Sequence, residues 1–180
     1  MNGLKKLLNE EIAYILYEDE SMIRDYQAIQ KTWFAKGQQR IIPTYGKHEG
    51  VKLVGFLNYE TGEVYVEEHK KYDAEVFRRF LIHVLEHYPE GEIVMILDNA
   101  KIHHANLLID LLDENPRLHL EFLPPYSPNL NKIEGLWGWL KNSVINNVFF
   151  HCREKIRIAV MQFVAYINTI PFTVIDRLCL

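Results

Sequence analysis

The sequence has few cysteines and no long hydrophobic run. Its two cysteines, Cys152 and Cys179, do not stand at a zinc-binding spacing, so we expect neither a disulfide framework nor a cysteine metal site. No apolar run reaches the roughly 18 residues that a membrane span requires. The first residues, 1–8, also lack the apolar stretch of a signal peptide. We therefore expect a cytoplasmic protein that does not contact a membrane.

The sequence also lacks an excess of positive charge. Twenty lysines and arginines stand against 24 acidic residues, for a net charge of -4. Because proteins gain affinity for nucleic acids by neutralising phosphates, this balance counts mildly against such a partner. The charge is uneven, however, since residues 31–52 hold five basic side chains and one acidic one, Glu49. That stretch is either a patch that faces phosphates or a solvated loop or hairpin.

Length and composition favour one globular domain. The chain has 180 residues, of which 48% are hydrophobic, and this is enough to bury a full core. We assign residues 1–11 to an N-terminal lead-in, 12–170 to the folded domain and 171–180 to a C-terminal tail. No repeat or low-complexity linker interrupts the domain.

Apolar runs and turn residues predict a mixed α/β sheet. Alternating or continuous apolar runs predict five strands, at residues 12–17, 51–58, 63–67, 93–97 and 118–123. Apolar residues at helical spacing predict four helices, at about 76–85, 105–114 and 128–147 and after 152. A hairpin followed by strands that helices connect predicts a sheet that is part antiparallel and part parallel, with helices on both faces.

Two predicted strands end in aspartates. Asp19 and Asp98 each follow an apolar run, and the carboxyl ends of parallel strands meet at one edge of a sheet. Taken singly, such an aspartate is more often only a solvated residue. If the two strands are parallel neighbours, however, the two carboxylates repel each other unless a cation lies between them. The pairing therefore indicates a shared metal ion.

Glu134 supplies a third carboxylate. It lies four residues after Leu130 and three before Trp137, so the helical period places it on the apolar face that packs on the sheet. A carboxylate there requires a partner, and the alternative to a metal ion is an ion pair with Lys101 or another lysine. Three carboxylates without cysteines suit Mg²⁺ or Mn²⁺. Two such ions about 4 Å apart activate water and stabilise a leaving 3′ oxygen, which indicates a nucleic acid backbone as substrate.

Three strings carry a resemblance to a known family. The strings are YEDES (17–21), LDNAKIHHA (97–105) and FLPPYSPNLNKIEGLW (122–137). Over about residues 12–168 the chain resembles the DDE transposases of bacterial insertion sequences that are related to the mariner superfamily. The resemblance implies a ribonuclease-H-like fold. It also implies that Asp19, Asp98 and Glu134 are the catalytic triad and bind two Mg²⁺ (or Mn²⁺) ions.

The resemblance further implies a reaction and partners. Water nicks the transposon end, and the freed 3′-OH attacks target DNA, so both DNAs are expected partners. Asn99 and His103 are expected to line the site, and Lys101, Lys132 and Trp139 to contact DNA. The helix-turn-helix domain typical of the family is absent from this sequence. End recognition is therefore compatible with a separate DNA-binding polypeptide, and paired ends are compatible with a homodimer.

Other functions stay open at this stage. A ribonuclease-H-like nuclease without strand transfer requires the same carboxylates. An inactive, domesticated domain that binds DNA or protein is the alternative outside enzymes, although the presence of all three carboxylates counts against it. His83 and His87, four residues apart on a predicted helix, are spaced to share a metal ion, but no third ligand is evident and a solvated helix end is favoured.

Overall fold

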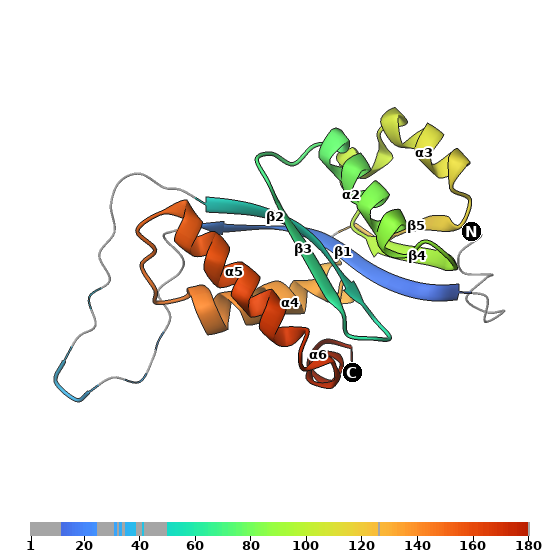
Figure 1. Cartoon of the computed structure of the whole chain (residues 1–180). Helices are drawn as coiled ribbons and strands as arrows, with labels where there is room; N and C mark the ends of the chain where they lie inside the picture. The colour runs from blue at the N-terminus through green and yellow to red at the C-terminus, as the bar shows by residue number, and fades with distance from the viewer. Residues whose placement is uncertain are drawn as a thin grey trace.

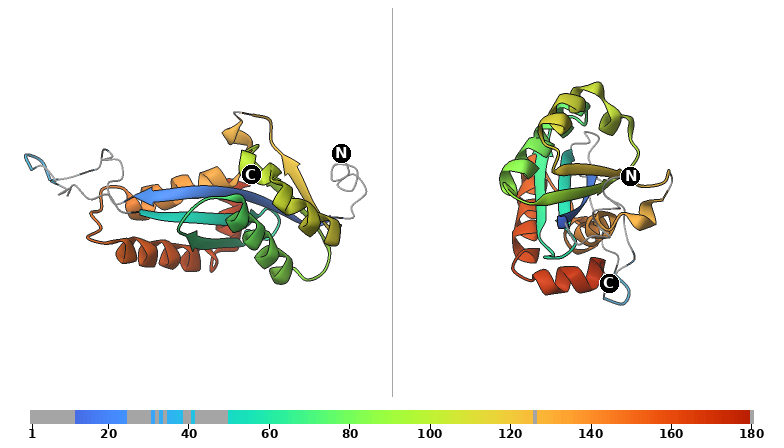
Figure 2. Two further views of the ribbon diagram at one scale, coloured as in Figure 1. Left: turned by 90° about the horizontal axis from the view of Figure 1, so that it is seen from above. Right: turned by 90° about the vertical axis from the view of Figure 1, so that its right-hand side faces the viewer.

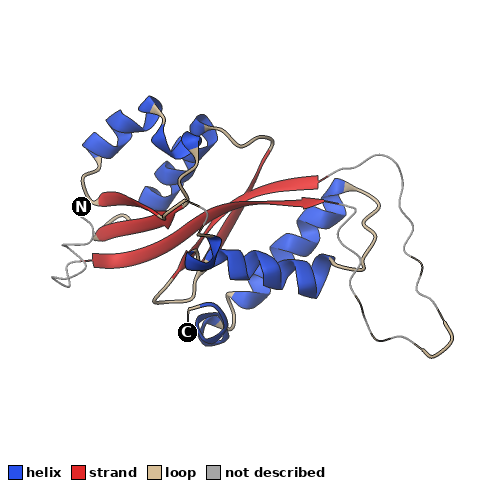
Figure 3. Cartoon of the chain, turned by 180° about the vertical axis from the view of Figure 1, so that it is seen from behind, coloured by secondary structure: helices blue, strands red, loops and turns tan. Residues whose placement is uncertain are grey.

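A five-stranded mixed sheet forms the centre of the protein in the computed structural model (Figures 1 and 3). The structure describes residues 12–24, 31, 33, 35–38, 41, 50–125 and 127–179. Its strands are β1 (Ile12–Arg24), β2 (Gly50–Asn58), β3 (Val64–His69), β4 (Glu92–Leu97) and β5 (Leu118–Phe122), in the spatial order β3-β2-β1-β4-β5. All five strands that the sequence predicted are therefore present.

The pairing of the strands follows the predicted order. β1, β2 and β3 are antiparallel neighbours, whereas β4 and β5 run parallel to β1. The β2–β3 hairpin turns at Gly62, whose φ of 72° is a conformation that glycine adopts without strain. The helical connections between β3, β4 and β5 allow the chain to return to the same edge before each parallel strand.

Helices and short helical turns connect the strands and complete the chain. Asp73 caps the first described helix, because its Oδ1 accepts a hydrogen bond of 2.9 Å from the backbone N–H of Val76. The helices and turns are α2 (Ala74–His87), η1 (Lys101–His104), η2 (Asn106–Leu108), α3 (Ile109–Glu114), η3 (Pro128–Leu130), α4 (Ile133–Leu140), η4 (Lys141–Ile145), α5 (Arg153–Ile167) and α6 (Pro171–Leu178).

The sheet separates two hydrophobic cores. α2 and α3 lie on one side of it, and α4, α5 and α6 lie on the other (Figures 1 and 2). Leu16 of β1 packs with the α2 side, and Ile23 packs with the α4 side. Because side chains alternate along a strand, Glu18 and Glu20 point toward the α2 side and Asp19 toward the α4 side.

β1 is longer than the sequence predicted. The predicted strand ended at Tyr17, but β2 pairs with β1 as far as Arg24, which lies opposite Gly50. The parallel pairing with β4 stops earlier, at Tyr17 and Ile96. Asp19 therefore lies inside β1, just beyond its last parallel pair, and not at the end of the strand.

The carboxyl-terminal helices also differ from the prediction. The helix predicted at 128–147 consists of η3, α4 and the π-helical turn η4, and Asn147 follows with a φ of 61°. The predicted tail holds α6, whose Val174 is fully buried in the core. The domain boundaries stay a prediction, and the lead-in 1–11 lies outside the described residues.

No single helix in the described part of the chain is long and apolar enough to cross a membrane. α5 and α6 together reach the required length and composition, but the pair is bent by 97°. Both helices contribute to the core on the α4 side of the sheet, for example through Val160 and Val174.

Candidate active site

The three carboxylates that the sequence singled out line one cavity. Asp19 comes from β1, Asp98 follows β4, and Glu134 lies in the first turn of α4. The cavity has a volume of about 440 Å³, and its wall also includes Asn99, Pro124, Pro125 and Asn131. Residues far apart in the sequence are thus brought to one place on the α4 side of the sheet.

The parallel register of β1 and β4 places the two aspartates. Tyr17 and Ile96 form the last parallel pair, and Asp19 and Asp98 follow that pair at the same offset. The side chain of Asp98 is 55% exposed, and its Oδ1 accepts a hydrogen bond of 2.8 Å from the backbone N–H of Ala100. That bond fixes the turn in which the chain leaves β4 and holds the carboxylate at the cavity.

Of the three carboxylates that line the cavity, Asp19 has the least favourable surroundings for a negative charge. Burial, and next the nearby charge of Glu134, raise the pKa of Asp19 to about 7. The indole Nε1 of Trp137 donates a hydrogen bond of 3.0 Å to Asp19 Oδ2, and this bond lowers the pKa in part. Trp137 is 2% exposed and belongs to the core on the α4 side of the sheet.

Gly55 allows the indole to reach Asp19. It lies opposite Asp19 in β2, and a Cβ at this position would come within 3.3 Å of the Trp137 ring and 2.6 Å of the Tyr65 carbonyl oxygen. Only a residue without a side chain leaves the ring this close to the sheet. The contact between sheet and helix therefore sets the position of the hydrogen bond to Asp19.

Glu134 reaches the cavity for a different reason than the one predicted. The sequence placed it on the buried face of a helix that began before Leu130, but α4 begins at Ile133 and Leu130 is 51% exposed. Glu134 itself is exposed, whereas Ile133 and Trp137 are buried. Because its carboxylate is exposed, Glu134 needs no partner to offset a cost of burial. Among the described residues, no ion pair joins Glu134 to Lys101 or another lysine.

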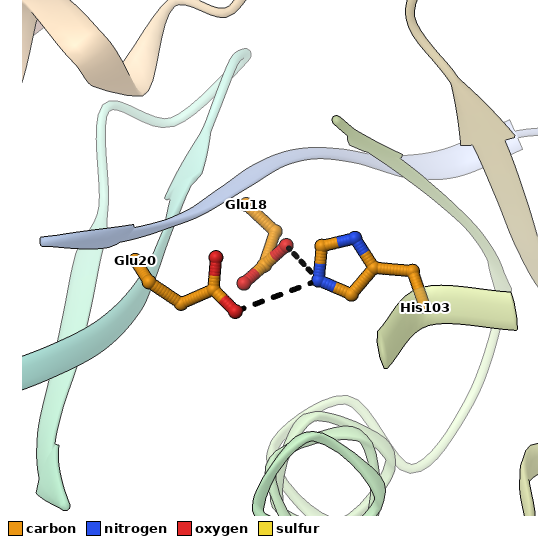
Figure 4. A group of neighbouring side chains, drawn as sticks. All are labelled: Glu18, Glu20 and His103. Carbon is orange, nitrogen blue, oxygen red and sulfur yellow. Dashed lines mark ion pairs between the residues drawn. The ribbon is translucent and has the colours of Figure 1, made fainter. Parts of the chain in front are cut away.

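The carboxylates share the cavity without forming a tight cluster. In the described part of the chain, the group of three acidic or histidine residues whose ligand atoms all lie within 4.8 Å of one another is a different one, Glu18, Glu20 and His103 (Figure 4). The Asp19, Asp98 and Glu134 oxygens are therefore more widely spaced than those of a site for a single ion.

The two accessory residues lie in different places. Asn99 lines the cavity, as predicted, and its Oδ1 contacts His104 Nε2. His103 does not line this cavity: it is 3% exposed and packs on Phe77 of α2, with 4.4 Å between the ring centroids. The turn η1 directs it to the opposite side of the sheet, behind Asp98.

The three residues predicted to contact DNA differ in exposure, and the contacts themselves stay a prediction. Lys101 is exposed and Lys132 is partly exposed. Trp139 is 9% exposed and packs on Phe163, and the guanidinium of Arg177 lies 4.6 Å from its ring centroid. Trp139, which was expected to contact DNA, is therefore part of the core, because α4 is covered by α5 and α6 and not by the sheet alone.

Two further features of the sequence were a histidine pair and a basic stretch. His83 contacts Glu67 at 3.0 Å and His87 contacts Glu63 at 2.8 Å, so the two histidines have separate partners and do not face a common ion. The basic stretch at 31–52 lies mostly outside the described residues, and its Arg40 and Lys47 are among those outside.

Sequence reasoning missed Asn131. It is 4% exposed, lines the cavity and donates a hydrogen bond of 2.8 Å from Nδ2 to the carbonyl oxygen of Glu18. The bond ties the start of α4 to β1 beside Asp19. The only signal in the sequence was an asparagine shortly before Glu134, which does not distinguish a buried polar contact from a solvated turn.

One family of known proteins matches most of this chain. The model of one family, described as DDE superfamily endonuclease, matches residues 14–157. An insertion element IS630 protein of 39 kDa from Shigella sonnei, described as uncharacterized, is 31% identical over 150 residues. That match covers 82% of this chain and 44% of the relative.

Solved structures show the same fold. The Mos1 transposase paired-end complex with left transposon end has a TM-score of 0.72 at 18% identity, and the match covers 98% of this chain and 55% of that one. Two structures of the Mos1 transposase catalytic domain with raltegravir, one with Mg and one with Mn, have TM-scores of 0.60 and 0.61 at 18% and 19% identity. These matches cover 90% of this chain and 76% and 75% of those domains. The predicted ribonuclease-H-like fold is confirmed, and the chain spans about half the length of the longer relatives.

Proposed function

The chain belongs to the DDE superfamily endonucleases, and from this membership we propose that it is the catalytic domain of a DNA transposase. In this proposal the domain hydrolyses a phosphodiester bond at a transposon end and then joins the freed 3′-OH to target DNA. The observation that carries the proposal is the arrangement of Asp19, Asp98 and Glu134 around one cavity, on three different elements.

The cavity fits divalent cations that prefer oxygen ligands. Its acidic residues offer only carboxylate oxygens, which suit Mg²⁺ and Mn²⁺ better than zinc. The raised pKa of Asp19, caused by burial and then by Glu134, shows that a charged Asp19 lacks compensation in the protein alone. A cation beside Asp19 would supply that compensation, and Mos1 catalytic-domain structures are described with Mg or Mn.

We assign two ions to the three carboxylates. Asp19 would contact both, with Asp98 completing one position and Glu134 the other, so the two outer carboxylates need not approach each other closely. This matches the wide spacing of the three side chains. Two bound ions would supply a nucleophile from water and stabilise the leaving 3′ oxygen.

The protein contributes position and access. Trp137 holds Asp19 from the core side, and the Ala100 N–H holds Asp98 at the end of β4. The exposure of Asp98 and Glu134 leaves the cavity open to a long, charged substrate. Lys101 is exposed and follows Asp98 by three residues, and in this proposal it would contact a phosphate of the bound strand.

Transposon-end DNA and target DNA are the partners that this function requires. Mos1 is described in a paired-end complex with its left transposon end. By analogy we propose that two ends are held together, either by a homodimer or with the help of a separate DNA-binding polypeptide. A cytoplasmic location would give the domain access to bacterial DNA.

A product analysis tests the proposal. The chain is incubated with Mn²⁺, a labelled duplex that carries the element's ends and a plasmid target, and the same is done with Asp98→Asn. We expect nicked ends and joined molecules from the parent, both reduced at least about a thousandfold in the variant, because metal contacts supply several kcal/mol of transition-state stabilisation. Asp110→Asn, which removes an exposed carboxylate from α3, is the matched control and should retain activity.

The products separate the alternatives. Nicked ends without joined molecules would support a nuclease that lacks strand transfer. Equal activity of the parent and Asp98→Asn would contradict the assignment of the site, and binding of DNA without any cleavage would support the inactive, domesticated domain.

A further inference from the structure

A second group of ligand-type side chains lies on the other face of β1. Glu18 and Glu20 alternate with Asp19 along the strand and point toward His103 of η1 (Figure 4). Glu18 is 0% exposed and His103 is 3% exposed, while the side chain of Glu20 retains 16% exposure. The proposed catalytic cavity does not include any of the three.

Buried polar atoms in this group have no hydrogen-bond partner. Among the described residues, neither carboxylate oxygen of Glu18 is hydrogen-bonded, and the same holds for Nε2 of His103. Burial of an unpaired, charged carboxylate is costly unless a cation compensates its charge or a proton neutralises it. The group therefore requires a ligand or a proton that direct contacts do not supply.

The distances within the group fit an ion between the side chains. His103 Nε2 lies 3.8 Å from Glu18 Oε2 and 3.6 Å from Glu20 Oε1. A charged hydrogen bond would bring such atoms to about 2.7–2.9 Å. By contrast, two ligand atoms that each lie about 2.1 Å from one zinc ion are about 3.4 Å apart at a tetrahedral angle. The observed spacing is close to that of ligands around a common ion.

The orientation of the imidazole also fits metal binding. Its Nδ1 lies 3.2 Å from both the carbonyl oxygen and the carboxylate Oδ1 of Asp98, and since these oxygens only accept, Nδ1 is the donor. In the neutral ring, Nε2 then directs its lone pair toward the two carboxylates. Histidines that bind metals hold their other nitrogen in this way, and the ring of Phe77 packs against the imidazole and fixes it.

We propose that Glu18, Glu20 and His103 bind one divalent cation of the zinc type, in a site separate from the catalytic cavity. Two carboxylates and an imidazole form a mixed oxygen and nitrogen set, which suits Zn²⁺ and does not suit Mg²⁺. Two negative charges balance one dication. Glu20, whose side chain is 16% exposed, is the most accessible of the three ligands, and His103 also borders a cavity of about 590 Å³ between η1 and β5.

The cation would act as a positioning element for the proposed catalytic site. His103 connects it to the backbone of Asp98, and β1 connects Glu18 and Glu20 to Asp19. The ion would therefore fix the end of β4 against β1 from the side opposite the cavity. It would touch neither substrate nor the reacting atoms.

Metal titration of a chain without the catalytic carboxylates tests the proposal. The full 180-residue chain carries Asp19→Asn, Asp98→Asn and Glu134→Gln, and calorimetry measures its binding of Zn²⁺ and Mg²⁺. We expect one equivalent of Zn²⁺ and no measurable Mg²⁺ binding. Addition of Glu18→Gln should weaken Zn²⁺ binding at least about a hundredfold, because it removes a ligand and not only an outer contact.

Matched controls keep the result interpretable. Glu86→Gln, an exposed glutamate of α2, should leave Zn²⁺ binding unchanged in the same background. Circular dichroism reports whether the Glu18→Gln chain folds. If it does not, zinc-edge anomalous diffraction from the parent background locates the ion directly, and a peak among Glu18, Glu20 and His103 supports the site.

Three outcomes would overturn the proposal: no retained Zn²⁺, equal affinity with and without Glu18→Gln, or an anomalous peak elsewhere. The first is the result expected if His103 is instead an imidazolium between the two glutamates. Because the tested chain lacks the proposed catalytic carboxylates, none of these outcomes bears on the proposed transposase activity.

Discussion

Asp19 must be charged to bind a cation, yet its surroundings favour the protonated form. Its pKa of about 7 arises from burial first and from the charge of Glu134 second. A folded protein that contains such a group, without a cation, becomes less stable as the pH rises from the ordinary value of about 3.8 toward 7. The surroundings of Asp19 thus disfavour its negative charge, and the proposed metal binding would relieve that cost.

Replacement of Asp19 by asparagine should stabilise the metal-free protein at high pH. In the folded state the raised pKa means that more protons are bound than in the unfolded state, so the destabilisation by Asp19 grows between pH 5 and pH 7 and is constant above. Two pKa units correspond to about 3 kcal/mol, and Asp19→Asn should therefore gain about 3 kcal/mol more at pH 8 than at pH 5. Denaturant unfolding in EDTA measures both values.

The asparagine retains an oxygen that accepts the Trp137 hydrogen bond, so the comparison isolates the charge. Addition of Mn²⁺ should make the parent more stable than Asp19→Asn, because the parent gains stability from the ion and the variant does not. An equal effect of the substitution at both pH values would show that Asp19 is an ordinary solvated aspartate.

At the scale of residues, prediction from sequence succeeded where polar groups follow apolar runs. The meeting of Asp19 and Asp98 at one cavity was predicted because a charged residue interrupts each strand pattern, and their catalytic role stays a prediction. Glu134 was placed correctly at the cavity for an incorrect reason, since the helix begins later than its apolar pattern suggested. His103 was assigned to the wrong face, because the direction of a short helical turn depends on backbone angles that the sequence pattern does not specify.

The contact between β2 and α4 determines the geometry of the site at the scale of elements. Trp137 lies over Gly55, opposite Asp19, and a Cβ on Gly55 would come within 2.6 Å of the Tyr65 carbonyl oxygen in the backbone of β3. Backbone atoms of a sheet do not move aside as the end of a flexible side chain does. The close approach of helix and sheet is therefore restricted to glycine.

Gly55→Ala should destabilise the protein and displace Trp137. We expect a loss of about 1–3 kcal/mol in the free energy of unfolding, as for other overpacked cores, and a lower activity in the nicking assay. Gly138→Ala is the matched control, because nothing lies within 4 Å of a Cβ there and α4 gains helix propensity worth about 1 kcal/mol.

Chemical denaturation of the two variants provides the comparison. A Gly55→Ala protein as stable as the parent would show that the sheet and α4 adapt to one another, and that the position of Trp137 is not fixed by this contact.

Elements were predictable where their periodicity was uninterrupted. α2 was predicted at about 76–85, since its apolar residues recur without a break. The extension of β1 to Arg24 was missed, because Glu18, Asp19 and Glu20 read as a strand end. α6, which begins at Pro171, was missed because such a short helix gains its stability from the burial of Val174 and Leu178. Only the tertiary structure reveals that burial.

At the scale of the whole molecule, two clusters of ionisable side chains lie on opposite faces of the central strand β1. The α4 side holds the cavity with Asp19, and the α2 side holds Glu18, Glu20 and His103. β1 pairs with both β2 and β4, so it lies in the middle of the sheet (Figure 3). A strand paired on both sides is the most constrained position in the fold, and this suits side chains that must hold ions at fixed distances.

The chain spans 44% of the Shigella sonnei relative and 55% of the Mos1 chain in the paired-end complex. Any activity that needs the rest of those proteins is therefore separate from the metal binding that we propose for this domain. The proposed metal binding can be measured without a cognate DNA sequence.

Crystals of the chain grown with Mn²⁺, and measured by anomalous diffraction at the manganese edge, test the central claim most directly. We predict two peaks about 4 Å apart in the cavity, one shared by Asp19 and Asp98 and the other by Asp19 and Glu134. A cavity without manganese, or ions bound to single carboxylates that share no ligand, would contradict the assignment of these three side chains to one catalytic site.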